Sequence, residues 1–267
     1  PNYNDSKNIT KVLKSLIEQS YRPIEIIVVD DCSTDNSVDV IEDFSKKNNY
    51  SIQIFKNKQN IGVVNTVNKY LKFLKGDYYF LGSANDELLT NFFFDALNTL
   101  KVNEQIKVIF GKVKCIKNDI EEITFKPKKL FESVVLNPKS YKKFILNDNP
   151  LGFSLTPSTI YHKSVFQNQD FEEYLQSYSD TYFTNNICLK HNCLYINKHF
   201  SYWVNDKNSY SQKKKIKKNI IIYFRFIIAV LKDRNIKLYG IKYFFRWVLL
   251  YPFKFFKFYI NRYFYRN

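Results

Sequence analysis

The segment IEIIVVDDCSTDNS, residues Ile24–Ser37, joins a short apolar run to a cluster of polar turn-forming residues. Residues 24–29 are mostly β-branched and apolar, which is typical of a parallel strand buried on both faces. Residues 30–36 supply turn residues and candidate helix caps, and residues 38–44 follow with apolar side chains at helical spacing. The segment therefore predicts a strand, a tight turn and a helix, with carboxylates at the carboxyl end of the strand.

The same alternation of strand and helix patterns extends through the first 114 residues. Further strands are expected at 52–55, 78–81 and 107–114, and helices at 9–17, 64–74 and 92–100. Two short helices are expected beyond this region, at 139–146 and 178–190. Strands that alternate with helices at this interval indicate βαβ units and a parallel sheet. We therefore expect an α/β fold, with a less regular middle at about 115–212.

The positive charge of the chain is concentrated near its end. The 267 residues carry 41 Lys and Arg and 25 Asp and Glu, a net charge of +16. Residues 213–267 hold 15 of the basic side chains and one acid, Asp233, so this tail carries +14 and residues 1–212 only +2. A uniformly basic nucleic-acid-binding domain would not have this distribution, and no nucleic-acid partner is expected. The four cysteines have no zinc-site spacing, which favours reduced thiols in a cytoplasmic protein.

The tail also holds 17 aromatic residues. Its uncharged apolar runs are far shorter than the roughly 20 residues that span a bilayer. Beyond Pro252, four basic residues fall on about half of a helical wheel: Lys254, Lys257, Arg262 and Arg266. This pattern is typical of a helix lying in a membrane interface, so an anionic membrane surface is an expected partner. A solvated or disordered tail is the alternative.

Polar clusters follow three of the predicted strand positions, at 1–5, 30–36 and 83–86. Ligands of open parallel sheets bind beyond the carboxyl ends of the strands, so we expect these clusters to converge. Carboxylates gathered there suit a hard cation, Mg²⁺ or Mn²⁺, bridging to a diphosphate. Neither a G-x-G-x-x-G nor a P-loop sequence is present, which argues against Rossmann dehydrogenases and P-loop NTPases.

Taken together, four segments resemble the inverting family 2 glycosyltransferases of the GT-A fold. They are PNYN (1–4), IEIIVVDDCSTDNS (24–37), NIG (60–62) with Asn68, and GDYYFLGSANDELL (76–89). The resemblance continues more loosely to about residue 205. It implies a Rossmann-like, mixed and mainly parallel sheet flanked by helices, with a donor half at about 1–114 and an acceptor half at about 115–212. The basic, aromatic and helical tail, 213–267, lies outside it.

The resemblance also implies roles for individual residues. Nucleotide-sugar contacts are implied for Pro1 and Tyr3 beside the base, Asp31 hydrogen-bonded to the base, and Asn60 and Asn85 along the donor; Asp86 is implied as metal ligand and Asp180 as catalytic base. Structural roles stay open for the carboxylates. In the cluster that contains Asp31, Asp30 could merely end a strand and Asp35 cap a helix. Asp86 could cap a helix, and Asp180 could be a helix cap or a solvated surface acid.

Two features depart from the family pattern. Where the family has D-A-D-D or D-S-D-D, this chain has Ser83-Ala84-Asn85-Asp86, so two carboxylates are replaced and metal binding should be weaker. The family's first strand, which is central in the sheet, should precede Pro1. Its absence, with the lack of any methionine, suggests an N-terminally clipped chain.

The expected function is transfer of a sugar, with inversion, from a nucleotide-sugar donor to a hydroxyl of a glycan or lipid-linked saccharide. A UDP-sugar is the expected donor. With the basic tail, this favours bacterial surface polysaccharide or lipooligosaccharide synthesis, on the inner face of the cell membrane. The alternative is a catalytically silent glycosyltransferase-like binding or scaffold protein at the membrane, which the altered metal motif would favour.

Overall fold

A computed structural model gives the fold. It describes residues 1–100, 105–117, 120–125, 127, 130–147, 156–167, 169–204, 216–232, 237–240 and 242–243.

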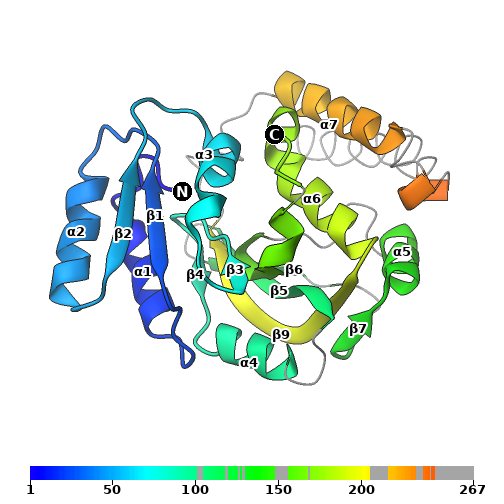
Figure 1. Cartoon of the computed structure of the whole chain (residues 1–267), viewed down its shortest axis with the longest axis horizontal. Coiled ribbons are helices and arrows are strands. Elements are labelled where there is room, and N and C mark those ends of the chain that lie inside the picture. Colours follow the sequence, from blue (N-terminus) through cyan, green and yellow to red (C-terminus); the bar gives the residue numbers. More distant parts are fainter. Residues whose placement is uncertain are drawn as a thin grey trace, which may run out of the picture.

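The first 73 residues alternate helix and strand as the sequence predicts (Figure 1). Their elements are α1 (Ile9–Ile17), β1 (Ile26–Asp30), α2 (Ser37–Lys47), β2 (Ile52–Lys56), α3 (Val63–Tyr70) and the 3₁₀ turn η1 (Leu71–Phe73). β1 and β2 pair in parallel, from Ile26 opposite Ile52 to Asp30 opposite Lys56. This two-stranded sheet has α1 and α2 packed against it through an apolar cluster that includes Ile9, Leu13 and Ile41.

The remaining strands form a seven-stranded sheet. The strands and helices that follow η1 are β3 (Tyr78–Phe80), β4 (Glu87–Leu88), α4 (Phe92–Leu100), β5 (Ile106–Lys117), β6 (Ile120–Phe125), β7 (Val134–Leu136), α5 (Pro138–Asn147), β8 (Thr159–His162), α6 (Ser179–Cys188), β9 (Asn192–Val204) and α7 (Ile216–Leu231), with 3₁₀ turns at η2 (Thr156–Ser158), η3 (Lys163–Phe166) and η4 (Glu173–Tyr178). The strand order is β3-β8-β5-β9-β4, with β6 beside β5 and β7 beside β9.

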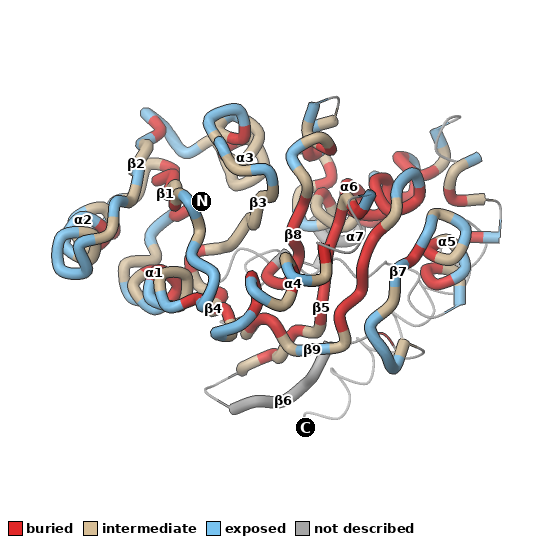
Figure 2. Tube along the Cα trace, turned by 60° about the horizontal axis from the view of Figure 1, so that its bottom comes forward, coloured by how far each residue is buried: buried red, intermediate tan, exposed pale blue. Residues whose placement is uncertain are grey.

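The sheet is mixed, in agreement with the expected α/β class, but the expectation of a mainly parallel sheet is wrong for it, because among the described strands no neighbouring pair is joined by a single βαβ crossover, the connection typical of parallel pairs. β5 and β9 run parallel, and the other pairs described in this sheet are antiparallel. Its centre is the most buried part of the molecule, as the red tube of β5, β8 and β9 shows (Figure 2). Gly111 in β5 lies under the ring of Phe200 in β9, where a Cβ atom would stand 2.3 Å from the ring. Only glycine allows the two strands to pack this closely.

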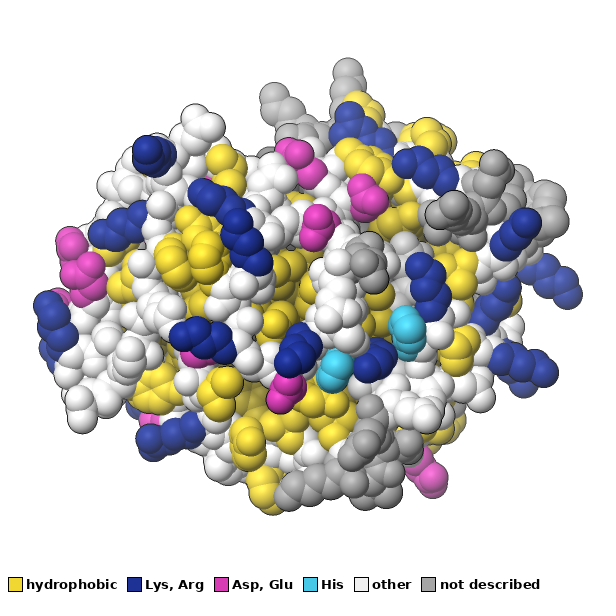
Figure 3. Space-filling view, viewed as in Figure 1, with side chains coloured by type: hydrophobic (Ala, Val, Ile, Leu, Met, Phe, Trp, Pro, Cys, Tyr) yellow, Lys and Arg dark blue, Asp and Glu magenta, His cyan; other side chains and the backbone are white. Residues whose placement is uncertain are grey.

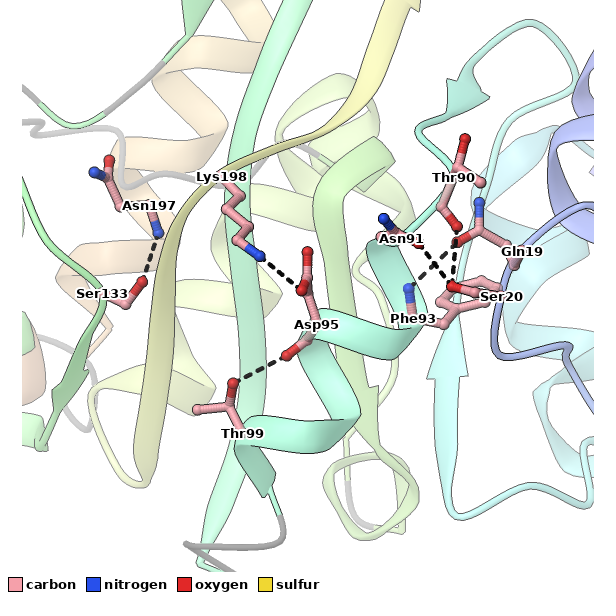
Figure 4. A network of polar contacts seen from close by, with 10 residues as sticks. All are labelled: Gln19, Ser20, Thr90, Asn91, Phe93, Asp95, Thr99, Ser133, Asn197 and Lys198. Atoms are coloured by element: carbon pink, nitrogen blue, oxygen red, sulfur yellow. Dashed lines mark hydrogen bonds and ion pairs between the residues drawn. The ribbon is translucent and has the colours of Figure 1, made fainter.

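Polar contacts join the end of α1 to the chain segment that contains β4 and α4, beside the seven-stranded sheet (Figure 4). Gln19, just after α1, donates from Nε2 to the carbonyl of Leu89 at 2.8 Å and accepts from the backbone N–H of Phe93 at 3.4 Å. On α4, the carboxylate of Asp95 pairs with the ammonium of Lys198 of β9 at 2.7 Å. The chain around β4 and α4 therefore links the two sheets.

β1 and β3 line one cavity near Pro1. Asn2 forms a single parallel bridge with Asp30: its N–H donates to the carbonyl of Val29 at 2.8 Å, and its carbonyl accepts from Asp31 N–H at 2.9 Å. The cavity has a volume of about 700 Å³ and is bordered by Pro1 and by residues of β1, β3, α1, α3 and α4. Its lining is predominantly apolar.

The tail contributes to the main core. Along α7, Ile222, Phe226 and Val230 are buried in the cluster that also contains Leu175 of η4 and Phe183 of α6. The division at residue 212 stays a prediction, but the packing of α7 shows that the first helix of the tail shares the core of the body. The interfacial helix expected beyond Pro252 lies outside the described residues. Within the described part of the chain, no helix is both long and apolar enough to cross a membrane.

Candidate active site

The turn after β1 is built around the buried carboxylate of Asp30. Its oxygens accept hydrogen bonds from Asn2 Nδ2 at 2.8 Å and from the Ser33 N–H at 2.9 Å and Ser33 hydroxyl at 2.5 Å. Asp35, also in this turn, accepts from the Ser37 N–H at 3.0 Å at the start of α2. Asp30 and Asp35 therefore have the structural roles that polar residues of a strand-to-helix turn commonly take.

Asp31, the next residue, is 3% exposed and faces the loop between β2 and α3. Its carboxylate accepts from Gly62 N–H at 2.8 Å, Asn57 Nδ2 at 2.9 Å and Ile61 N–H at 3.0 Å. Gly62 has a φ of +83°, a left-handed conformation that glycine adopts without strain. Asp31 thus fixes the loop that contains the Asn60-Ile61-Gly62 motif.

Asn57 was not singled out in the sequence, although it completes this arrangement. It is buried and bonds Asp31 and Thr66 through Nδ2, while its Oδ1 accepts from Lys69 Nζ at 2.8 Å. The available signal was its place directly after the strand 52–56, in the position that Asp31 occupies after β1.

The other expected donor residues border the same region. Tyr3 is 50% exposed, so its ring is available to a ligand, and Pro1 lines the cavity beside β1. The Asn60 side chain accepts from Gly62 N–H at 3.1 Å at an exposed position. Pro1, Tyr3, Asp31 and Asn60 therefore lie around the carboxyl end of β1, where the sequence places them.

Asp86 is buried at the junction with the end of β9. Its carboxylate accepts from the Ser83 hydroxyl and, at 3.2 Å, from the backbone N–H of Val204. Burial, with a smaller contribution from the nearby charge of Asp5, raises the pKa of Asp86 to about 6 despite these hydrogen bonds. A cation bound beside Asp86 would relieve this penalty, because positive charge favours the ionised carboxylate.

The donor set around Asp86 fits a cation that is shared with a ligand. Asn85 donates from Nδ2 to the carbonyl of Val204 at 3.4 Å, which aligns it on the same strand end as Asp86. Among the described residues no group of three or more His, Cys, Asp or Glu side chains could hold a metal alone. Mg²⁺ is commonly bound by one or two carboxylates together with substrate phosphates, which matches Asp86 with Asp5 nearby. Asp5 belongs to the polar cluster at 1–5 that the sequence predicts to converge here, although the sequence does not single it out as a ligand.

Asp180 lies on another element, in the first turn of α6. Its carboxylate accepts from the N–H of Thr181 at 2.6 Å. It also contributes to raising the pKa of the buried Tyr161, although burial is the main cause of that shift. A carboxylate at a helix N-terminus is stabilised in its ionised form, which is the form a general base needs.

Comparison with known proteins supports the reading of the motifs. The sequence profile described as glycosyl transferase family 2 matches residues 1–174. The chain is 27% identical over 207 residues to a poly(ribitol-phosphate) beta-glucosyltransferase of Bacillus spizizenii, covering 76% of this chain and 31% of that protein. It is 26% identical over 188 residues to the poly(ribitol-phosphate) beta-N-acetylglucosaminyltransferase TarS of Staphylococcus aureus, covering 69% and 30%. The chain thus spans about a third of the length of these relatives.

Solved structures show the same fold. A crystal structure of S. aureus TarS 1–349 with UDP-GlcNAc superposes with a TM-score of 0.69 at 20% identity, covering 90% of this chain and 68% of that chain. The mannosyltransferase PcManGT of Pyrobaculum calidifontis, solved with GDP-Man and Mn²⁺, gives 0.59 at 14% identity and covers 92% and 67%. With the family profile spanning the strand-end motifs and most of both sheets, the chain belongs to glycosyl transferase family 2.

Proposed function

We propose that the chain is the catalytic region of an inverting glycosyltransferase that moves a sugar from a UDP-sugar to a hydroxyl of a bacterial surface glycan. The observation that carries the proposal is the group of polar residues around the carboxyl end of β1, held by the hydrogen bonds from Asn57, Ile61 and Gly62 to Asp31. The names of two relatives add support, since both are glycosyltransferases that act on poly(ribitol-phosphate).

In this proposal the donor is held by two parts of the site. Tyr3, Asp31 and Asn60 border the nucleotide base, and the exposed ring of Tyr3 offers it a stacking face. Asp31 has three hydrogen bonds from the protein, and a carboxylate offers about four acceptor positions, so one more can serve a base N–H.

Asp86, with Asp5 and Asn85 beside it, would hold Mg²⁺ or Mn²⁺ together with the diphosphate. The metal, when bound, would act as a Lewis acid that offsets negative charge on the leaving diphosphate. The fixed hydrogen bonds of Asp86 to Ser83 and Val204 keep its carboxylate oriented.

Asp180 is the proposed general base. It would accept the proton of the acceptor hydroxyl as that oxygen attacks the anomeric carbon and the nucleoside diphosphate leaves. A single displacement of this kind inverts the configuration at the anomeric carbon. A positioned base of this type contributes about 10²–10⁴ to the rate.

The names of the relatives support the proposed acceptor, and the tail supports the proposed location of the protein at a membrane. A hydroxyl on a glycan, a lipid-linked saccharide or a polymer related to poly(ribitol-phosphate) is the proposed acceptor. On α7, Ile221, Phe224 and Ile228 are 54%, 57% and 59% exposed and lie three to four residues apart. Residues with this spacing share one helix face. An exposed apolar face on a helix of the basic tail supports peripheral binding to an anionic membrane on the cytoplasmic side.

The test is a screen of nucleotide sugars by released nucleoside diphosphate, with Mn²⁺, Mg²⁺ or a chelator and with poly(ribitol-phosphate) as acceptor. Release that depends on one UDP-sugar and increases with acceptor is the expected result. Absence of release from every donor, in a chain that is folded, would overturn the proposal.

The second candidate, a catalytically silent member that binds the same ligands, is favoured by one observation. The Ser83–Asp86 segment offers one carboxylate, and Asn85 is an amide that donates to Val204. The variant Asn85→Asp separates the two candidates, because each added carboxylate strengthens binding of a hard cation. An active enzyme would keep or gain rate in Mn²⁺, whereas a silent protein would bind UDP without turnover in either form.

A further inference from the structure

A basic pocket lies at the edge of the large sheet where β5 and β9 begin. Its volume is about 350 Å³, and it is lined by Gln105, Lys107, Lys190, His191 and Asn192. Among the described residues, the lining holds two lysines and a histidine and no carboxylate. Figure 3 shows histidine side chains among lysine or arginine side chains on this face of the molecule.

This pocket lies at the opposite end of β9 from Asp86. β9 starts at the pocket, where Asn192 pairs with Ile106, and it ends at Val204, whose N–H bonds Asp86. Its 13 residues follow a path of about 40 Å, at roughly 3.3 Å per residue. The proposed binding of UDP and metal therefore leaves the pocket unexplained.

His162, at the end of β8, extends the basic group. Lys107 Nζ lies 3.4 Å from its Nδ1, which also accepts from the Ser164 N–H at 3.2 Å. Accepting this N–H keeps the neutral ring protonated at Nε2. The carboxylate of Asp77 acts on the pKa of His162 in the opposite direction to Lys107, and it is paired with Lys163 at 2.8 Å.

In the described part of the chain, the charges that act on both histidines are mostly positive. The pKa of His191 is lowered by burial and then by the charges of Lys107 and Lys190. The pKa of His162 is lowered by burial and by Lys107 and Lys163, and Asp77 opposes this only in part. An anion placed among these groups would interact favourably with both lysines and would favour protonation of the rings.

We propose that Lys107, Lys190 and His191, extended by His162, bind phosphate groups of an anionic polymer that serves as acceptor. The proposal deepens the proposed function and rests on it. Ammonium groups bind phosphate as point charges, and a polymer with a phosphate in each repeat can occupy this pocket while a distant repeat reaches Asp180. A neutral glycan would gain nothing from these charges.

The direct test uses the fact that the chain has only three histidines, His162, His191 and His199. NMR titration of their ring C–H signals with pH, with and without linear tripolyphosphate, reports on each ring. We expect tripolyphosphate to raise the pKa of His162 and His191 and to leave His199, which lies farther along β9, unchanged. Equal response of all three, or of none, would overturn the proposal.

Variants show whether the lysines hold the phosphate. Lys107→Gln should weaken tripolyphosphate binding by roughly tenfold, the effect of losing one charged hydrogen bond. Its matched control is Lys46→Gln, which removes the same charge from an exposed position on α2 and should bind as wild type. With poly(ribitol-phosphate) as acceptor, Lys107→Gln should raise the KM for the polymer more than it lowers kcat. An unchanged KM and unchanged tripolyphosphate affinity would reject the site.

Two further measurements distinguish a polymer from lipid headgroups as the ligand of the pocket, and failure of the pocket proposal from failure of the proposed function. Vesicles containing anionic phospholipid are added as competitor; displacement of tripolyphosphate at equal phosphate concentration would assign the pocket to lipid headgroups and reject the polymer. UDP titration of the wild-type chain is run in parallel. Loss of UDP binding with intact histidine responses would reject the proposed function and leave the phosphate pocket, whereas the reverse result would reject only the pocket.

Discussion

The carboxylate of Asp31 accepts a hydrogen bond from the backbone N–H of Gly62 at 2.8 Å. The two residues are 31 positions apart, and the bond ties the end of β1 to the start of α3. Gly62 holds the left-handed φ of +83° that aims its N–H at the carboxylate. Asp31 therefore sets the shape of the Asn60-Ile61-Gly62 loop. The family resemblance implies a donor contact both for Asp31 and for this loop.

Replacing Asp31 by Ala should weaken both the fold and nucleotide binding. Its hydrogen bonds to a charged group are worth about 1.5–3 kcal/mol each, and the freed donors are partly buried. We expect a folded variant with a lower free energy of unfolding in urea and a much weaker UDP affinity by calorimetry. The control is Asp43→Ala, an exposed carboxylate of α2, which should change neither. Wild-type UDP affinity in folded Asp31→Ala would exclude Asp31 from the donor site.

The stability of the chain should respond to pH through Asp86. Its pKa is raised from 3.8 to about 6, so between these values the folded chain binds a proton that the unfolded chain does not. Ionisation of Asp86 therefore costs stability as pH rises through this window, and the full cost, about 3 kcal/mol for a shift of two units, is present above pH 6. Asp86→Asn should be more stable than wild type at pH 7.5 and equal to it near pH 3.5. Thermal unfolding at the two pH values measures this, and a gain that is the same at both would refute the assignment.

Replacing Asp180 by Asn should stop proton acceptance while keeping the shape of the side chain. The amide oxygen can still accept from the N–H of Thr181, so α6 should begin as before. We expect transfer to fall by about 10²–10⁴ and UDP affinity to stay near wild type. If transfer continues at the wild-type rate, another group is the base, and Glu172 or Glu173 is tested next.

The exposed face of α7 should contribute to membrane binding. Phe224→Ser removes an apolar side chain that is 57% exposed, so vesicle binding should weaken while the fold is retained. Phe226→Ser, two residues on, changes a side chain that is 1% exposed and should instead destabilise the core. Co-sedimentation with anionic and neutral vesicles at low and high salt is the measurement. Equal partition of Phe224→Ser and wild type would leave the exposed face without a role at membranes.

An extended apolar segment joined to Pro1 should stabilise the molecule. The bridge between Asn2 and Asp30 shows the direction in which such a segment would pair with β1, and the cavity beside it has room for side chains. Two buried valines would contribute about 3 kcal/mol, at roughly 1.5 kcal/mol each. A five-residue Val- and Ile-rich extension should raise Tm, and a Gly-Ser extension of equal length should not. Equal melting temperatures for the two extensions would show that no strand forms there.

Local pattern was sufficient for most of the elements. The apolar run 24–29, the turn residues after it and the helical spacing of α1, α2, α4, α5 and α6 are set by neighbours in sequence, and the expected ranges agree with the structure to within a few residues. The convergence of residues 1–5 and 30–36 was also predictable, because parallel strands place their carboxyl ends at one edge.

The tertiary structure alone decided the rest, because those features depend on residues far apart in the chain. Most pairs of the large sheet are antiparallel, which apolar runs cannot reveal. Three features of the site each join separate segments of the chain. They are the three donors that bind the Asp31 carboxylate, the charge of Asp5 acting on Asp86, and the basic pocket at the start of β5 and β9. The sequence by itself determined which side chains are present. The tertiary structure determined which carboxylate is buried and therefore has a raised pKa, and which lysines from separate segments line one pocket.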